Sequence, residues 1–91
     1  MENKFLPIGS IVLLKGASKK IMVTGFLCKE PNNEKIYDYV GCPYPEGMIS
    51  FDTNLLFDNN QIDKVIEEGY KDNDEILYKQ KLNELVDNLN K

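Results

Sequence analysis

The residue types that usually carry out catalysis or bind metals are scarce in this chain. It contains no histidine, so no serine or cysteine can be activated by an imidazole base. Its two cysteines, Cys28 and Cys42, are too few for a four-ligand zinc site. We expect both to be free thiols, and a structural thiol is favoured over a reactive one. These observations predict no catalytic residue, no metal site and no cofactor.

Carboxylates are more numerous, but their spacing does not suit catalysis or calcium binding. Asp58 and Asn60, like the run 72–74, lack the following glycine and glutamate of a calcium loop. We interpret them as turn and cap residues. Glu67 and Glu68 are neighbours, and neighbouring residues of a strand point to opposite faces. The sequence therefore predicts a protein that is not an enzyme.

The best candidate for a binding surface is the run 37–47, which reads YDYVGCPYPEG. Tyrosine offers a rigid contact area at low entropic cost. The candidate contact residues in this run are Tyr39, Pro43, Tyr44, Pro45 and Glu46. The alternative interpretation is that the tyrosines fill a small core while the prolines fix a turn. Both interpretations stay open, and we favour the second.

Short strands would have to position this run. Apolar, β-branched segments predict strands over residues 10–15 and 20–28, with Gly25 as a bulge or bend. A third strand is predicted over residues 35–41. Pro43 ends it, because proline cannot donate a hydrogen bond to the ladder.

The next segments give weaker signals. Residues 51–57 contain a possible fourth strand around Leu55 and Phe57. Residues 62–70 fit either a helix or a closing strand. We favour one 3₁₀ turn near Ile62, followed by a strand.

A helix is predicted at the end of the chain. Asp72 is a suitable N-cap, and Glu75 follows it at the spacing of a capping box and precedes Lys79 by one helical turn. At 100° per residue, one apolar face of the helix is formed by Tyr78, Leu82, Leu85, Val86 and Leu89. Ile76 and Leu77 lie off this face. Either the first turn is buried on two sides, or a partner covers these two residues; we favour packing against the chain's own sheet.

Together these elements predict an α+β fold in a single domain, residues 1–91. Its β-rich body would span residues 1–70 and its C-terminal helix residues 71–91. Four to five short strands joined by tight turns indicate a small, strongly bent antiparallel sheet or an SH3-like barrel. The helix would cover an open side of it.

Composition narrows the classes of partner. The 91 residues carry a net charge of −4, and all 11 basic residues are lysines. Because arginine is the main residue for reading phosphate and guanine, nucleic-acid binding is not expected. Residues 46–91 hold five lysines and eleven acids, which we interpret as a solvated surface or a docking site for a basic partner.

Hydropathy and the first residues suggest a location. No apolar run approaches the roughly 18–20 residues that span a bilayer, so membrane insertion is not expected. The first residues lack the basic and apolar regions of a signal peptide. We therefore expect a cytoplasmic protein.

Four segments follow one another along the chain: 6–16 (LPIGSIVLLKG), 37–47, 56–57 and 62–70. In this order they resemble a small family of uncharacterised proteins from Gram-positive bacteria (Firmicutes), over roughly residues 6–75. Members are encoded near type VII secretion genes and LXG-type toxins. The resemblance implies an accessory role, such as adaptor, chaperone or immunity factor, and supplies no catalytic residue.

These observations lead to one expected function and two alternatives. We expect a partner-binding module, an adaptor or chaperone-like accessory of type VII secretion, whose partner is an unidentified protein. The first alternative is an immunity protein for a neighbouring toxin. The second is a structural subunit that forms a homodimer through its C-terminal helix, with Ile76 and Leu77 as contacts.

Overall fold

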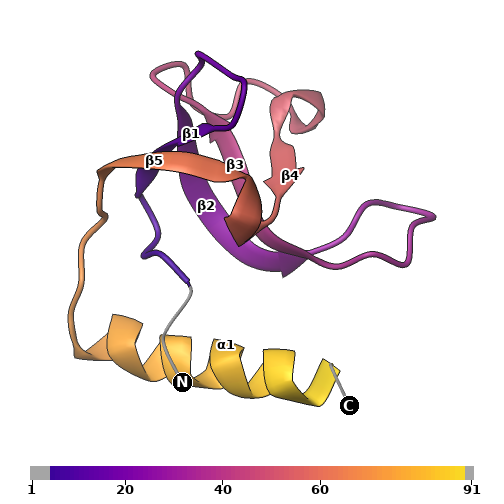
Figure 1. The fold of residues 1–91 in the computed structure, drawn as a ribbon, viewed down its shortest axis with the longest axis vertical. Helices are drawn as coiled ribbons and strands as arrows, with labels where there is room; N and C mark the ends of the chain where they lie inside the picture. Colours follow the sequence, from indigo (N-terminus) through magenta and orange to yellow (C-terminus); the bar gives the residue numbers. More distant parts are fainter. Residues whose placement is uncertain (1–4, 90–91) are drawn as a thin grey trace.

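One antiparallel sheet and one C-terminal helix make up the fold (Figure 1). The computed structural model describes residues 5–89. The strands are β1 (Ile11–Leu14), β2 (Ile21–Cys28), β3 (Tyr37–Pro43), β4 (Leu55–Phe57) and β5 (Ile62–Glu67). Two 3₁₀ turns, Phe51–Thr53 and Asn59–Gln61, flank β4, and the helix α1 spans Asn73–Leu89. This confirms the predicted α+β class.

The sheet is open. Its strand order is β4-β3-β2-β1-β5, so β4 and β5 form the two edges. Of the two forms predicted, the bent antiparallel sheet is present, and the closed barrel is not. The predicted irregularity at Gly25 is confirmed, because the β2–β3 register shifts between Val23 and Gly25. A side chain at Gly25 would meet the Val40 side chain at 2.8 Å, which explains why glycine occupies the bulge.

The structure also decides the predictions for residues 51–57 and 62–70, where the sequence signals were weaker. The segment 51–57 divides into a 3₁₀ turn and the short strand β4. The expectation of a 3₁₀ turn followed by a strand in the segment 62–70 is confirmed, since the turn Asn59–Gln61 leads directly into β5. β3 ends at Pro43, as predicted.

Tyr39 is the centre of the core. Its side chain is fully buried, stacks on Phe57 at a ring distance of 5.2 Å, and meets Phe5 edge-on at 5.9 Å. Its hydroxyl accepts a hydrogen bond from Leu6 N (2.9 Å) and donates one to Asn59 Oδ1 (3.2 Å). Burial raises the pKa of this phenol to about 12. Tyr39 therefore ties the N-terminal segment, β3 and the turn before β5 together.

The helix begins where the sequence predicted. Asp72 caps it by accepting a hydrogen bond from Glu75 N at 3.0 Å. In the described part of α1, however, Leu82 is the only buried residue. Of the other residues on the predicted apolar face, Val86 is half-buried, whereas Tyr78, Leu85 and Leu89 are more than half exposed. The prediction that this whole face packs against the sheet is therefore wrong.

A pair of charged residues occupies part of the contact between α1 and the sheet. Glu75 and Lys79 lie on the covered side of α1 and form an ion pair at 2.8 Å, with side chains only 15% and 13% exposed. Within residues 5–89, no helix is long and apolar enough to cross a membrane.

Candidate functional site

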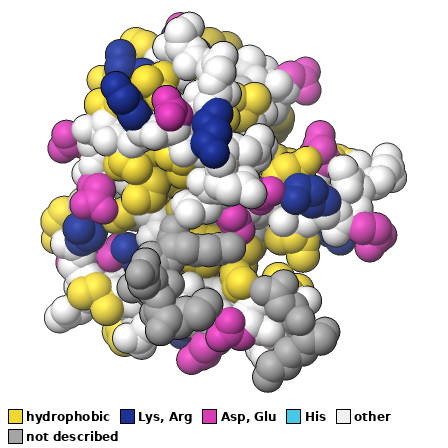
Figure 2. Space-filling model, viewed as in Figure 1, with side chains coloured by type: hydrophobic (Ala, Val, Ile, Leu, Met, Phe, Trp, Pro, Cys, Tyr) yellow, Lys and Arg dark blue, Asp and Glu magenta, His cyan; other side chains and the backbone are white. Residues whose placement is uncertain are grey.

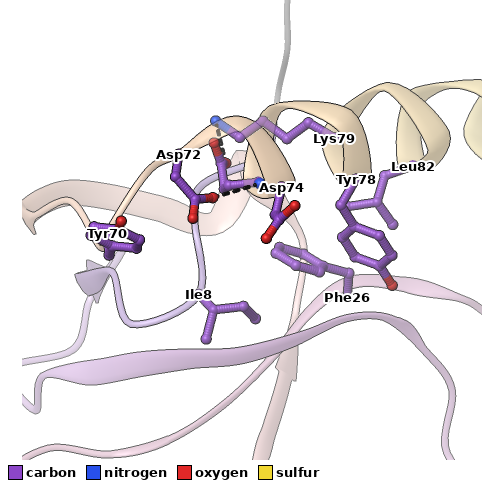
Figure 3. Close-up of a pocket in the computed structure, with 9 residues that line it drawn as sticks. Ile8, Phe26, Tyr70, Asp72, Asp74, Tyr78, Lys79 and Leu82 are labelled. Carbon is purple, nitrogen blue, oxygen red and sulfur yellow. Dashed lines mark hydrogen bonds and ion pairs between the residues drawn. The ribbon is translucent and has the colours of Figure 1, made fainter.

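A pocket of about 390 Å³ lies between the sheet and the start of α1 (Figure 3). Tyr70 and Phe26 stand on opposite sides of it, Ile8 forms its floor, and Asp72 and Asp74 lie above. The full lining comprises Ile8, Phe26, Tyr70, Asp72, Asp74, Glu75, Tyr78, Lys79 and Leu82. Four parts of the chain thus contribute to it: the N-terminal turn, β2, the linker before α1 and the first turns of α1.

The walls are largely aromatic and accessible to water. Phe26 and Tyr78 pack side by side, with ring centroids 6.0 Å apart and planes inclined by 50°. Tyr70 is 80% exposed and Tyr78 is 53% exposed, and half of Ile8 is also exposed. Burying such side chains is worth about 1.5–3 kcal/mol each. The folded chain therefore leaves apolar surface in the pocket exposed to water.

A hydrogen-bonded contact between Ser10 and Gly69 fixes two of the walls. Gly69 N donates to Ser10 Oγ (3.0 Å), and Ser10 Oγ donates to the Pro7 carbonyl (2.7 Å). The backbones approach so closely that a side chain at Gly69 would collide with the Ile8 carbonyl oxygen. Ile8 and Tyr70 each adjoin this contact in the chain, so their positions follow from it.

The charged groups of the pocket leave an excess of negative charge. Glu75 and Lys79 neutralise each other. Asp72 serves as the N-cap, and Asp74 has no ion-pair partner among residues 5–89. Just outside the pocket, Lys71 pairs with Glu68 at 3.1 Å. Among the described residues 5–89, no cation therefore pairs with the carboxylates of Asp72 and Asp74.

The apolar surface continues beyond the pocket along α1. Leu85 and Leu89 follow Tyr78 at spacings of seven and eleven residues, which places all three on one side of a helix. Each is more than half exposed. We name the pocket together with this stripe the pocket face. Figure 2 shows exposed hydrophobic side chains beside acidic ones around the linker that leads into α1.

The predicted contact residues of the run 37–47, which we name the tyrosine-proline run, do not line the pocket. Tyr44 N donates to the Lys20 carbonyl (2.9 Å), next to the start of β2, whereas the pocket uses Phe26 near the end of β2. Five to six strand residues separate these points, or about 17–20 Å. Tyr44 and Pro45 are exposed at that remote end, and Pro43 is half-buried.

Two residues of the run are already engaged within the protein. Tyr39 is part of the core, so its prediction as a partner contact is corrected: its hydroxyl and ring are inaccessible. Glu46 forms an ion pair with Lys19 at 2.6 Å. The hydrogen bond from Lys19 holds the pKa of Glu46 below its usual range.

Ile76 and Leu77 are exposed, by 48% and 58%. Neither residue is among those that line the pocket. On α1, Leu77 lies on the side opposite Leu82 and Lys79, and Ile76 lies about 120° around the helix from Leu82. The structure therefore does not bring them together with the tyrosine-proline run. It leaves the two predicted groups on separate surfaces.

Sequence reasoning missed the pocket residues. Ile8, Phe26 and Tyr70 come from three distant segments, and no periodicity links them. A second exposed apolar segment was also missed: Met48, Ile49 and Phe51 follow the tyrosine-proline run, and Phe51 is 83% exposed. A local signal for this segment exists, since three apolar residues come directly after a turn.

The cysteines are free thiols and do not face each other. Cys42 pairs with Met22 and Cys28 pairs with Tyr37, at opposite ends of the β2–β3 ladder. Among residues 5–89, no group of three or more histidine, cysteine, aspartate or glutamate side chains is arranged to hold a metal ion.

The fold and the pocket define a small α+β domain with an apolar, acid-rimmed cavity between its sheet and its C-terminal helix. The chain belongs to the family described as Domain of unknown function (DUF4176), whose model matches residues 5–77. The match covers the whole sheet and the start of α1, and it confirms the expected membership of an uncharacterised domain family. No curated protein and no solved structure matches the chain significantly.

Proposed function

We propose that this protein is a binding module for another protein, which it recognises through the pocket face. The observation that carries the proposal is that α1 docks through Leu82, the half-buried Val86 and an ion pair, while Tyr78, Leu85 and Leu89 remain more than half exposed. Exposed apolar surface of this kind, bordered by charged residues, is typical of interaction sites. The pocket supplies an anchor position and the α1 stripe supplies further contact area.

The shape of this surface suits a helical segment of the partner. A helix laid along α1 could insert one anchor side chain into the pocket and pack others against Leu85 and Leu89, as in helix-in-groove recognition. Tyrosine side chains such as Tyr70 and Tyr78 are common at the centres of such contacts, because they bury much area at low entropic cost.

The resemblance to proteins encoded near type VII secretion genes and LXG-type toxins suggests the biological setting. We propose an adaptor or chaperone-like accessory role in the cytoplasm of a Gram-positive bacterium. The partner would then be a protein encoded next to this chain. An immunity role and a structural role as a homodimer are the alternatives.

Binding measurements with variants test the proposal. The proteins encoded beside the gene are purified and titrated against the wild-type chain by calorimetry. Tyr78→Ala should weaken binding of the true partner by about fivefold to thirtyfold, as expected for a residue at the centre of an interface. Phe51→Ala removes a more exposed aromatic from the other apolar segment and should change the affinity less than twofold.

Two results would overturn the proposal. The first is that none of these proteins binds below about 100 μM, a weak affinity of roughly −5.5 kcal/mol. The second is that Phe51→Ala weakens binding while Tyr78→Ala does not. Light scattering on the chain alone tests the homodimer alternative, which predicts a dimer that Leu77→Ala dissociates. Expressing the chain in cells that produce the neighbouring toxin tests the immunity alternative, which predicts that the chain alone rescues these cells.

A further inference from the structure

We infer that the pocket recognises the side chain of a lysine or arginine on the partner protein. The inference rests on the proposed function and names the chemistry of the group that enters the pocket. Two features point to it: an aromatic lining formed by Phe26, Tyr70 and Tyr78, and a rim whose carboxylates, Asp72 and Asp74, form no ion pair within the described part of the chain.

The aromatic lining suits a long cationic side chain. Lysine and arginine carry an apolar stem that packs against apolar surface while the charged end stays near water. The faces of aromatic rings also attract a cation placed within about 6 Å of the ring centroid. In Figure 3 the rings of Tyr70 and Phe26 border the pocket from two sides, and Ile8 completes the apolar floor for the stem.

The rim supplies the complementary charge. Because the ammonium group of Lys79 is paired with Glu75, it does not neutralise Asp72 or Asp74. The N-terminus of α1 contributes an opposing partial charge of about +0.5. This is smaller than the charge of the two carboxylates, so a cation remains the favoured occupant.

The surroundings reinforce the negative potential. Residues 46–91 carry eleven acids and five lysines, and this half of the chain supplies most of the pocket lining. A basic segment of the partner would therefore be attracted over some distance before it docks, with an association rate that falls as salt is added.

Matched small probes separate charge from shape. The blocked amino acid N-acetylarginine methylamide is titrated into the ¹⁵N-labelled full chain, and amide shifts are followed by NMR. N-acetylcitrulline methylamide, which replaces the guanidinium with a neutral urea of the same shape, is the control probe. The arginine probe should shift the signals of Phe26, Tyr70 and Tyr78 and bind about threefold to tenfold more tightly than the citrulline probe.

Charge variants supply the second arm of the experiment. Asp74→Asn removes a rim charge, and Asp72→Asn removes the other while asparagine remains a good N-cap. Each should weaken binding of the arginine probe by about twofold to fivefold and leave the citrulline probe unchanged. Asp52→Asn, an exposed carboxylate outside the pocket, is the matched control and should have no effect.

The outcomes are decisive. Equal binding of both probes, binding that maps to other residues, or no shift with tens of millimolar of the arginine probe would each overturn the inference. If a partner still binds and Tyr78→Ala still weakens it, the proposed protein-binding function stands without the cation. If no partner is found but the arginine probe binds as expected, the pocket chemistry stands and the proposed function fails.

Discussion

Replacing Tyr39 with phenylalanine tests whether this residue of the tyrosine-proline run acts as a fold determinant. The substitution keeps the ring stacked on Phe57 and removes the hydroxyl, which accepts from Leu6 N and donates to Asn59 Oδ1. Asn59 is exposed and can bond to water instead, but Leu6 is half-buried. An orphaned buried donor costs about 1–3 kcal/mol. We expect a loss of about 1.5 kcal/mol in the free energy of unfolding, or roughly 6–12 °C in Tm for a domain of this size.

Urea unfolding at neutral pH, followed by circular dichroism, measures this loss. Tyr44→Phe is the matched control, because it removes the same oxygen from an exposed side chain at the end of the run. It should change the free energy of unfolding by less than about 0.5 kcal/mol. Equal effects of the two substitutions, or a loss below about 0.5 kcal/mol for Tyr39→Phe, would refute this role for the Tyr39 hydroxyl.

Three further predictions concern titration, the buried ion pair and the linker. Burial raises the pKa of Tyr39 from 10.0 to about 12, so the folded state holds the phenol proton to a higher pH than the unfolded chain does. The contribution of this difference to the free energy of unfolding is complete below pH 10 and is lost between pH 10 and 12. Unfolding midpoints at pH 9 and pH 11 should therefore differ less in Tyr39→Phe than in the wild type; an equal difference would contradict the assignment. Lys79→Met leaves the Glu75 carboxylate buried without its cation and should cost about 2–3 kcal/mol, much of it restored by adding Glu75→Gln; a double-mutant cycle without coupling would count against the pair. Gly69→Ala places a methyl group against the Ile8 carbonyl and should destabilise the protein by about 1–3 kcal/mol, with faster hydrogen exchange in α1; unchanged exchange would mean that this contact does not hold the helix.

Local signals were sufficient to predict most of the fold. The bulge at Gly25, the end of β3 at Pro43 and the Asp72 cap each depend on properties of one or two residues, such as a missing side chain, a missing N–H or a short acceptor. The order of turn and strand before Glu67 followed from the same kind of reasoning. Closure of the sheet could not be predicted, because it depends on whether β4 and β5 pair with each other; they follow one another in the chain, yet tertiary contacts place them at opposite edges of the sheet.

The candidate site was largely unpredictable for the same reason. Its walls come from Ile8, Phe26, Tyr70 and the start of α1, and only the folded chain brings them together. Tyr39 illustrates the opposite error. Its type and neighbours allow both a core and a contact role, and burial decides between them.

The orientation of α1 is the observation that best links fold to function. A helix docked only to bury apolar surface would turn by roughly 60° so that Tyr78 and Leu85 replaced Glu75 and Lys79 against the sheet. Because each of those two side chains is already about half covered, completing their burial would gain about half of the 1.5–3 kcal/mol of a full burial. The ion pair would become exposed to water, which would remove the cost of its partial desolvation. Instead, α1 covers the Glu75–Lys79 pair and leaves Tyr78, Leu85 and Leu89 more than half exposed, while the Gly69–Ser10 contact fixes the linker that leads into the helix. Intramolecular burial does not account for this arrangement, whereas a partner that covers the pocket face would.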